Sequence, residues 1–401
     1  MYTVPFEQKG GSDMQKIKQY ILHAMRCVDP VLFFCVMGLC LVSIVTVYGA
    51  VDNFGQSKLK MQIAMFIVGS IATVLIASVD FRLIVDRLWL PMLIVSAVLL
   101  LITLIWGESG VNMETGNKSW LKIPVINYMI QPSEFVKFAF VCSFAKHLFD
   151  LQDHINHPRS VLFLALHAGL IVGLILLSGD LGVALVYLAI IAIMLFCAGL
   201  HPAYFGGASV LLVLFSPYLW DKLEPYQQRR IIVGFNPELD PLGKGYQPLL
   251  SRQAIGNGGF YGNGVFGGYY YEILDASHTD FIFATICEKF GFLGGFLVLV
   301  LFMIIVVRIF MIARFAIHSD YGGLICVGVG AMFVTQILEN IGMNLAMLPV
   351  VGITLPFLSC GGSSMLATFM MVGLVHSVYS HSEALRETRA DTLDMDISLL
   401  E

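Results

Sequence analysis

Two short segments of the sequence place ionisable side chains beside long apolar runs. In the first, SHTDFIF, the acid Asp280 stands where a polar region ends and an apolar run begins. A carboxylate at such a boundary can take a proton from a polar substrate while an attached lipid tail stays in the bilayer. A second acid, Glu288, follows deeper in the same run. This pattern predicts chemistry on a lipid-linked molecule.

A local role for Asp280 is the alternative. Thr279 is a residue type that caps helices, and an acid at the first helical position complements the positive end of the helix dipole. In that case Asp280 would need no substrate. The residues alone leave both explanations open.

The second segment is QPSEFVK, which begins at Gln131. Proline followed by serine and glutamate marks a helix start, with Ser133 as a candidate N-cap. Glu134 and Lys137 are then three residues apart on one helix face. They can neutralise each other as an internal ion pair, or Lys137 can hold a pyrophosphate group of a substrate. Both alternatives stay open.

Weaker candidates lie in polar segments. Asp180, in the turn SGDLG, is best explained as a helix cap. Arg229 belongs to YQQRR, which follows interfacial aromatic residues and suits either a phosphate group or a solvated loop. Another polar segment, from about residue 108 to residue 131, holds a lysine and a tryptophan. The candidate substrate-binding residues are Glu134, Lys137, Arg229, Glu288, Lys118 and Trp120.

The elements that must position these residues are membrane helices. Hydrophobic residues make up 57% of the chain, charged residues 13%, and the mean hydropathy is +0.81, which excludes an ordinary soluble domain. Uncharged runs of roughly 20 residues, the length of a spanning helix, recur along the chain. They cover 31–51, 61–79, 88–107, 160–179, 181–200, 202–220, 290–307, 322–338 and part of 341–382. With the weaker run 135–149, we expect an all-α multispan membrane protein of about ten transmembrane helices.

The basic residues orient this array. Lysine and arginine are frequent in the short segments on the side of the amino terminus and rare on the other side, which is the positive-inside bias. We therefore expect a cell-membrane protein with both termini in the cytoplasm. A cytoplasmic tail is predicted over 1–30, a membrane domain over 31–382 and a second cytoplasmic tail over 383–401. A long extracellular loop, about 221–279, is expected between helices 7 and 8.

Several other functions are disfavoured. The formal net charge of −5 is small and scattered, which argues against a nucleic-acid partner. The eight cysteines contain no CxxC pair and fit packing roles. Gly262, Gly264 and Gly267 match a dinucleotide fingerprint, but the strand that must precede it is missing from the pattern. The surrounding segment 256–268 is rich in glycine and predicts a mobile or a closely packed backbone.

Taken in order, these sites resemble those of the SEDS family, the multispan shape, elongation, division and sporulation proteins of bacteria. The resemblance covers almost the whole chain from Asp29 onward. It rests on QPSEFVK, on FNPELDPLGKGYQ from Phe235, on SHTDFIFATICEKFGFLGG from Ser277, and on NIGMNLAMLPVVGITLPFLSCGGSS from Asn340. Strings of this length in this order make the resemblance specific.

The resemblance implies ten transmembrane helices and a peptidoglycan glycosyltransferase that polymerises lipid II on the outer face of the membrane. Undecaprenyl pyrophosphate would be the leaving group. The acid of the family's HTDF motif falls on Asp280, and the family's Glu and Lys after QPS fall on Glu134 and Lys137. The chain departs from the family at Lys289, where a second acid is frequent, so Glu288 is the single carboxylate there.

With that chemistry, Asp280 is expected to act as the general base. A single attack without a covalent sugar intermediate would invert the anomeric centre. Lys137, Arg229 or a divalent cation, Mg²⁺ or Mn²⁺, would stabilise the departing pyrophosphate.

The resemblance also implies a partner, a class B penicillin-binding protein that acts as transpeptidase. Its membrane helix is expected on the apolar run 291–307, where Gly291, Gly294 and Gly295 would permit close approach. An elongation role is favoured, and a division- or sporulation-specific polymerase is the alternative. A lipid II flippase and a scaffold for the transpeptidase are the alternatives from other classes.

Overall fold

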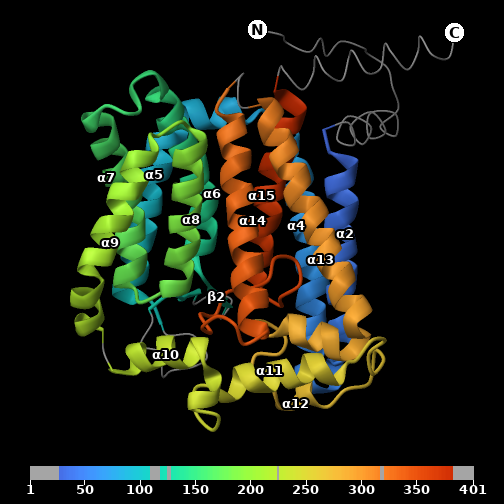
Figure 1. Cartoon of the computed structure of the whole chain (residues 1–401). Coiled ribbons are helices and arrows are strands. Elements are labelled where there is room, and N and C mark those ends of the chain that lie inside the picture. The colour runs from blue at the N-terminus through green and yellow to red at the C-terminus, as the bar shows by residue number, and fades with distance from the viewer. Residues whose placement is uncertain (1–26, 109–117, 124–127, 224, 317–319, 383–401) are drawn as a thin grey trace, which may run out of the picture.

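The computed structural model is a bundle of long helices with shorter helices lying across one end (Figure 1). It describes residues 27–108, 118–123, 128–223, 225–316 and 320–382. The predicted tail 383–401, and residues 1–26 of the predicted tail 1–30, lie outside the described residues. The boundaries of these predicted regions therefore stay predictions.

The bundle of the described chain contains ten long helices. Seven are long and apolar enough to cross a membrane: α2 (Pro30–Tyr48), α4 (Gln56–Ala77), α5 (Phe81–Trp106), α7 (Pro158–Leu177), α13 (Ile282–Ala316), α14 (Gly322–Asn344) and α15 (Gly362–His381). Two further apolar helices are α8 (Leu181–Cys197) and α9 (Pro202–Lys222). The apolar part of α9 ends at Tyr218. The tenth is α6 (Pro132–Asp150), which the interrupted run predicted. The expected all-α multispan fold is confirmed.

The helix starts follow from local sequence. Asp29, Asp80 and Asp180 cap the helices that follow them, because each carboxylate accepts a backbone N–H of the first turn. Proline opens α2, α6, α7 and α9, where its missing N–H costs no helical hydrogen bond. The capping role predicted for Asp180 is confirmed. The N-cap predicted at Ser133 is wrong, because α6 already begins at Pro132.

The predicted loop 221–279 is largely helical. It contains α10 (Pro225–Phe235), α11 (Tyr246–Asn257) and α12 (Tyr270–Ile273), which lie across the end of the bundle opposite the start of α2 (Figure 1). Short elements elsewhere are α3 (Val51–Phe54) and the 3₁₀ turns η2 (Gln152–His154) and η3 (Pro237–Leu239). The first polar segment holds an antiparallel pair of three-residue strands, β1 (Leu121–Ile123) and β2 (Tyr128–Ile130).

Helices α14 and α15 form the centre of the protein. In their most apolar windows 72% and 78% of the residues are buried, against 17% for α4 and 22% for α5. Polar side chains on α14 and α15 therefore face other parts of the protein and not lipid. Buried polar groups in such a place need partners or a functional reason to be there.

Helix α13 is interrupted at Gly291, whose φ of 66° and ψ of −162° are not helical. The break frees backbone groups, each of which would cost several kcal/mol if left unpaired in a membrane. The glycine-rich segment satisfies them: Asn263 N and Gly264 N donate to Glu288 O and Lys289 O, while Phe292 N and Leu293 N donate to Gly259 O and Phe260 O. Of the two states expected for 256–268, the structure therefore has the closely packed one.

Candidate active site at the outer end of the bundle

Asp280 lies in the turn directly before α13, at the end of the bundle that carries α10 to α12. Its side chain is half-buried. The helix begins at Ile282, two residues beyond the start that the capping alternative required. The Thr279 hydroxyl donates to the carbonyl oxygen of Ala276 at 3.3 Å. The local alternative therefore does not describe this turn.

The backbone around Asp280 is held by hydrogen bonds from other segments. Four consecutive carbonyl oxygens accept them: Ser277 O from Thr285 Oγ1 (2.9 Å), His278 O from Cys360 N (2.8 Å), Thr279 O from Ser359 Oγ (2.7 Å) and Asp280 O from the Nδ2 atoms of Asn340 and Asn344 (2.9 Å each). A turn fixed at every carbonyl presents its side chain in a prearranged position, which is what a catalytic group needs.

Two asparagines of α14 hold the carbonyl of Asp280 itself. Asn340 and Asn344 are one helical turn apart and fully buried. Beyond the Asp280 carbonyl, Asn340 Nδ2 donates to Ile353 O at 2.7 Å, and Asn344 Oδ1 accepts the N–H of Ala284 at 3.0 Å. The pair thus joins the turn, the start of α13 and the segment after α14 at one point.

Gly352 lies against the carboxylate of Asp280. A Cβ atom on Gly352 would stand 3.7 Å from Asp280 Oδ2, and its φ of 74° is one that other residues rarely adopt. The backbone of this segment therefore passes close to the carboxylate. A larger residue at this position would both strain the chain and occupy space beside the acid.

Glu134 and Lys137 form the ion pair that their spacing predicted. Lys137 Nζ donates to Glu134 Oε1 at 2.9 Å, and both side chains are buried in the bundle. A third charged residue, Glu339 of α14, lies within electrostatic reach of the Lys137 ammonium. Its Oε2 atom is buried and has no hydrogen-bond partner. Lys137 therefore lies near two carboxylates.

Glu288 lies in the interior of the protein and not at an open surface. It is fully buried, and its carboxylate accepts the backbone N–H groups of Tyr269, Tyr270 and Tyr271, each at 2.8 Å, as well as Asn257 Nδ2 at 3.3 Å. These bonds cap the start of α12 and attach it to α13. The geometry is that of a structural anchor for the outer helices.

Lys289, the departure from the family pattern, complements this anchor. Its ammonium donates to the carbonyl oxygens of Gly49, Val265 and Gly267 at 3.2, 3.0 and 3.2 Å, so all three of its protons are used. It also lies 3.8 Å from the ring centre of Tyr271. Lys289 therefore links α2, the glycine-rich segment and α13 by hydrogen bonds, at a position where the family frequently has a second acid.

The remaining candidates lie on the outer rim. Arg229 of α10 is largely exposed and pairs with Asp240 at 3.2 Å. Trp120 forms a β-bridge with Glu108 beside β1, and the Lys118 N–H donates to Ser178 O at 3.0 Å while the Lys118 side chain is exposed. These residues can meet an incoming head group at the rim of the bundle.

The charge state around the turn is set by burial. Burial, with the nearby Lys58 ammonium, lowers the pKa of His278 to about 4, so this imidazole is neutral near pH 7. Its ring packs against Phe54. Among the described residues, no group of three or more His, Cys, Asp or Glu side chains is arranged to hold a metal ion.

Sequence reasoning missed the residues that position Asp280. Asn340, Asn344 and Ser359 stand in one of the strings that carry the family resemblance, yet nothing in their spacing shows that they reach the turn. The signal that could have found them is polarity: amide side chains inside a helix as buried as α14 require a partner. Glu339 carries the same signal.

Comparison with known proteins supports the family resemblance. Residues 25–384 match the family model of the FtsW, RodA and SpoVE cell cycle proteins. A probable peptidoglycan glycosyltransferase FtsW of Trichlorobacter lovleyi is 35% identical, over 87% of this chain and 92% of its own length. The stage V sporulation protein E of Bacillus subtilis is 34% identical, over 88% and 97%. The peptidoglycan glycosyltransferase MrdB of Escherichia coli is 30% identical, over 90% and 95%.

Solved structures agree with these relatives. A chain from a study of how a peptidoglycan synthase complex coordinates polymerisation and crosslinking matches with a TM-score of 0.76 and 28% identity, over 88% of this chain and 98% of that one. The rod shape determining protein RodA of Thermus thermophilus matches with a TM-score of 0.66 and 26% identity, over 88% and 97%. The fold and the order of its parts are thus shared along nearly the whole chain.

Proposed function

Because this chain belongs to the FtsW, RodA and SpoVE family and is a peptidoglycan glycosyltransferase, we propose that Asp280 is its general base and lipid II its substrate. The observation that carries the assignment is the turn itself. Four of its consecutive carbonyls are held by other segments, and the acid it presents is half-buried at the end of a spanning bundle.

The proposed reaction joins two glycans at the outer face of the membrane. The acceptor hydroxyl gives its proton to the Asp280 carboxylate as its oxygen bonds to the anomeric carbon of the donor. The bond from that carbon to the pyrophosphate breaks, and the electron pair leaves with undecaprenyl pyrophosphate. One displacement of this kind inverts the anomeric centre.

Stabilisation of the pyrophosphate is assigned to cationic groups. Lys137 lies near two carboxylates, so its charge is partly offset before a substrate arrives. Arg229 on the rim is exposed enough to meet a phosphate once it leaves Asp240. Mg²⁺ or Mn²⁺ stays a prediction, and its role would be to arrive with the diphosphate and balance the charge that develops there.

The orientation proposed for the protein follows the charge bias. The end of the bundle that carries Asp280 and α10 to α12 faces outward. The start of α2 and the end of α15 face the cytoplasm. A single cysteine at the exposed Leu242 should then react with an impermeant reagent outside the cell, and one at the exposed Gln152 only after permeabilisation. The reverse pattern would invert the assignment.

The partner proposed is a class B penicillin-binding protein. Support comes from the similar chain in a complex that combines polymerisation and crosslinking. The close approach expected at Gly291, Gly294 and Gly295 is wrong for Gly291 and Gly295, because both are buried within the protein, whereas Gly294 is half-buried. The exposed face of the same helix, which includes Phe292, Phe296 and Met303, is the surface that a transpeptidase helix can cover.

The cellular role is proposed as elongation, the role favoured in the sequence analysis. Relatives of comparable identity include a sporulation protein as well as MrdB. A division- or sporulation-specific role therefore remains the alternative. The flippase and scaffold alternatives predict no polymer from the purified protein.

The deciding experiment is polymerisation of purified lipid II by the purified protein with its transpeptidase. Asp280→Asn keeps the shape of the side chain and removes its basicity, so the rate should fall by about 10²–10⁴-fold. Asp275→Asn is the matched control, since Asp275 is exposed in the same loop and bonds Gln247. Glycan chains made by Asp280→Asn at a near wild-type rate would refute the assignment.

A further inference from the structure

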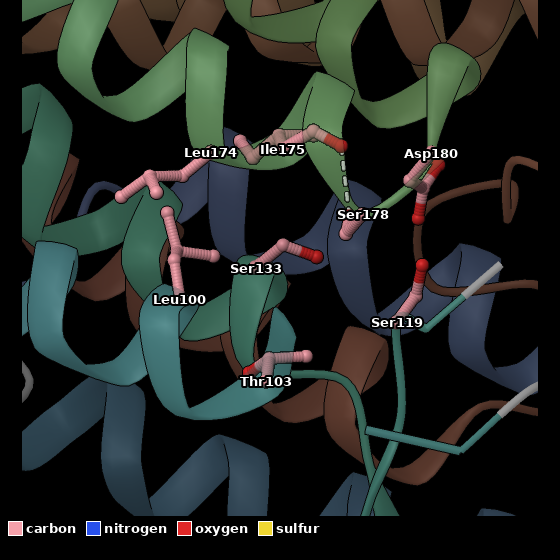
Figure 2. Close-up of a pocket in the computed structure, with 8 residues that line it drawn as sticks. All are labelled: Leu100, Thr103, Ser119, Ser133, Leu174, Ile175, Ser178 and Asp180. Carbon is pink, nitrogen blue, oxygen red and sulfur yellow. Dashed lines mark hydrogen bonds between the residues drawn. The ribbon is translucent and has the colours of Figure 1, made fainter. Parts of the chain in front are cut away.

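A small cavity lies between α5, α6, α7 and the turn before α8 (Figure 2). Its free space admits about one water-sized sphere. The residues that line it are Leu100, Thr103, Ser119, Ser133, Leu174, Ile175, Ser178 and Asp180. It has no part in the reaction described above.

Two serine hydroxyls in this cavity have unused acceptor capacity. Ser119 and Ser133 are each 6% exposed; the Ser133 Oγ atom is buried without a hydrogen bond, and the buried Ser119 hydroxyl meets only the Asp180 carboxylate. Figure 2 shows the Ser119 hydroxyl directed toward the Asp180 carboxylate and the Ser133 hydroxyl directed into the space beside it. The other hydroxyls are used, since Ser178 donates to Ile175 O and Thr103 to Leu99 O.

The carboxylate in the cavity lacks a counter-charge. Asp180 is 8% exposed, and the groups that donate to its two oxygens are neutral: Val183 N and Gln131 Nε2, each at 3.1 Å, and the Ser119 hydroxyl. None of the ion pairs between described residues includes Asp180. The charged group that acts on it is the Glu134 carboxylate, which with burial raises the pKa of Asp180.

A buried carboxylate of this kind is unfavourable unless a positive charge joins it or it takes a proton. Lys118 is next to Ser119 in the chain, but its side chain is exposed. A ligand of this cavity must balance the negative charge of Asp180, bind to the two hydroxyl oxygens and fit the small free volume. A small bare cation with a preference for oxygen ligands meets the three conditions.

We propose that this cavity binds one sodium ion between the Asp180 carboxylate and the hydroxyl oxygens of Ser119 and Ser133. One carboxylate balances one positive charge. A divalent ion would leave one uncompensated positive charge in this buried space, which is unfavourable. The bound ion joins the segment 118–123 to the starts of α6 and α8. It therefore stabilises the helix that carries Lys137, with no role in the chemical step.

Thermal unfolding of the purified full chain in detergent tests the proposal. At equal ionic strength, NaCl should raise Tm above its value in choline chloride, saturably and on the order of 2 °C. Asp180→Asn and Ser133→Ala should each abolish this difference. Ser160→Ala is the matched control: Ser160 is also 6% exposed, but it lies at the opposite end of α7, and this variant should keep the difference.

Direct binding of radioactive sodium provides the second measurement. Wild type and Ser160→Ala should retain one ion per chain, displaced by unlabelled NaCl, and Ser133→Ala should retain none. Equal Tm in both salts together with no bound sodium overturns the proposal in favour of a protonated Asp180 and a water. Sodium dependence that survives in Ser133→Ala overturns it as well, because the ion would then lie elsewhere. Should Asp180→Asn fail to fold, Ser133→Ala still decides.

Discussion

The Nδ2 atom of Asn340 lies 2.9 Å from the backbone carbonyl oxygen of Asp280, and Asn344 places its own Nδ2 at the same distance from the same oxygen. Both lone pairs of that carbonyl are therefore used by buried amides of one helix. Helix α14 therefore helps to fix the position of the candidate base, together with Thr285, Ser359 and Cys360, which hold the neighbouring carbonyls.

The first prediction concerns this support. Asn340→Ala should reduce the polymerisation rate by at least about tenfold with little change in KM, because a misplaced base loses its geometry while the substrate still binds. The change also leaves two buried carbonyls short of a donor, at about 1–3 kcal/mol. Asn53→Ala removes a similar bond, to Tyr271 O, away from the turn and serves as the control. An unchanged rate would remove Asn340 from the positioning role.

The second prediction concerns the ion pair of α6. Lys137→Met leaves Glu134 buried without its partner and should lower the free energy of unfolding by about 3–5 kcal/mol. Glu134→Gln combined with Lys137→Met should recover part of this loss, but not all, since Glu339 also loses a neighbouring cation. Lys146→Met, on the same helix, breaks ion pairs with Asp86 and Asp150, whose side chains are both exposed, and should therefore cost less than Lys137→Met. Strictly additive effects at Glu134 and Lys137 would contradict the pairing.

The third prediction separates an anchor from a substrate ligand at Glu288. Glu288→Gln puts an amide donor against the N–H groups of α12, so Tm should fall and the glycine-rich segment should become sensitive to protease. The loss should be at least about 2 kcal/mol, since bonds to a charged acceptor are the stronger class. Glu272 is exposed in α12, so Glu272→Gln should leave Tm and protease sensitivity unchanged. A rise in KM with unchanged Tm would instead favour substrate binding.

The fourth prediction uses His278. Its pKa is lowered from 6.5 to about 4 by burial and by Lys58, so the unfolded chain binds a proton at pH values where the folded chain does not. The stability from this neutral imidazole is complete above about pH 6.5 and is lost as the pH falls toward 4. Wild-type Tm should therefore drop more steeply over this window than that of His278→Gln. Parallel curves would show that His278 does not contribute.

The fifth prediction concerns the proposed partner surface. Phe296→Ala should weaken co-purification with the transpeptidase, because large aromatic residues dominate such contacts. Leu83→Ala, on an equally accessible face of α5, should leave co-purification unchanged. If the two variants behave alike, the transpeptidase helix packs on another side of the bundle.

The sequence predicted the fold because its information is local. Runs of apolar residues are enough to place spanning helices, and the spacing of Glu134 and Lys137 is enough to pair them on one face. Glu288 could not be interpreted in this way, because its donors at Tyr269 to Tyr271 come from a turn that meets α13 only in three dimensions. The expected partner contact at the glycines of α13 failed for a related reason: Gly291 and Gly295 are buried within the protein, and no helical repeat in the sequence contains the break at Gly291.

The break at Gly291 also separates two mechanical parts of α13. Residues 282–290 share their backbone bonds with the glycine-rich segment, while residues 292–316 form the continuous span that presents the exposed face. Because the helical backbone is interrupted at Gly291, the direction of the span does not set the direction of the first part of α13. That first part is held instead by the glycine-rich segment and, through the Ala284 N–H and Asn344, by α14. The orientation of the catalytic end therefore comes from contacts made from the side, and not from continuation of the lipid-facing helix.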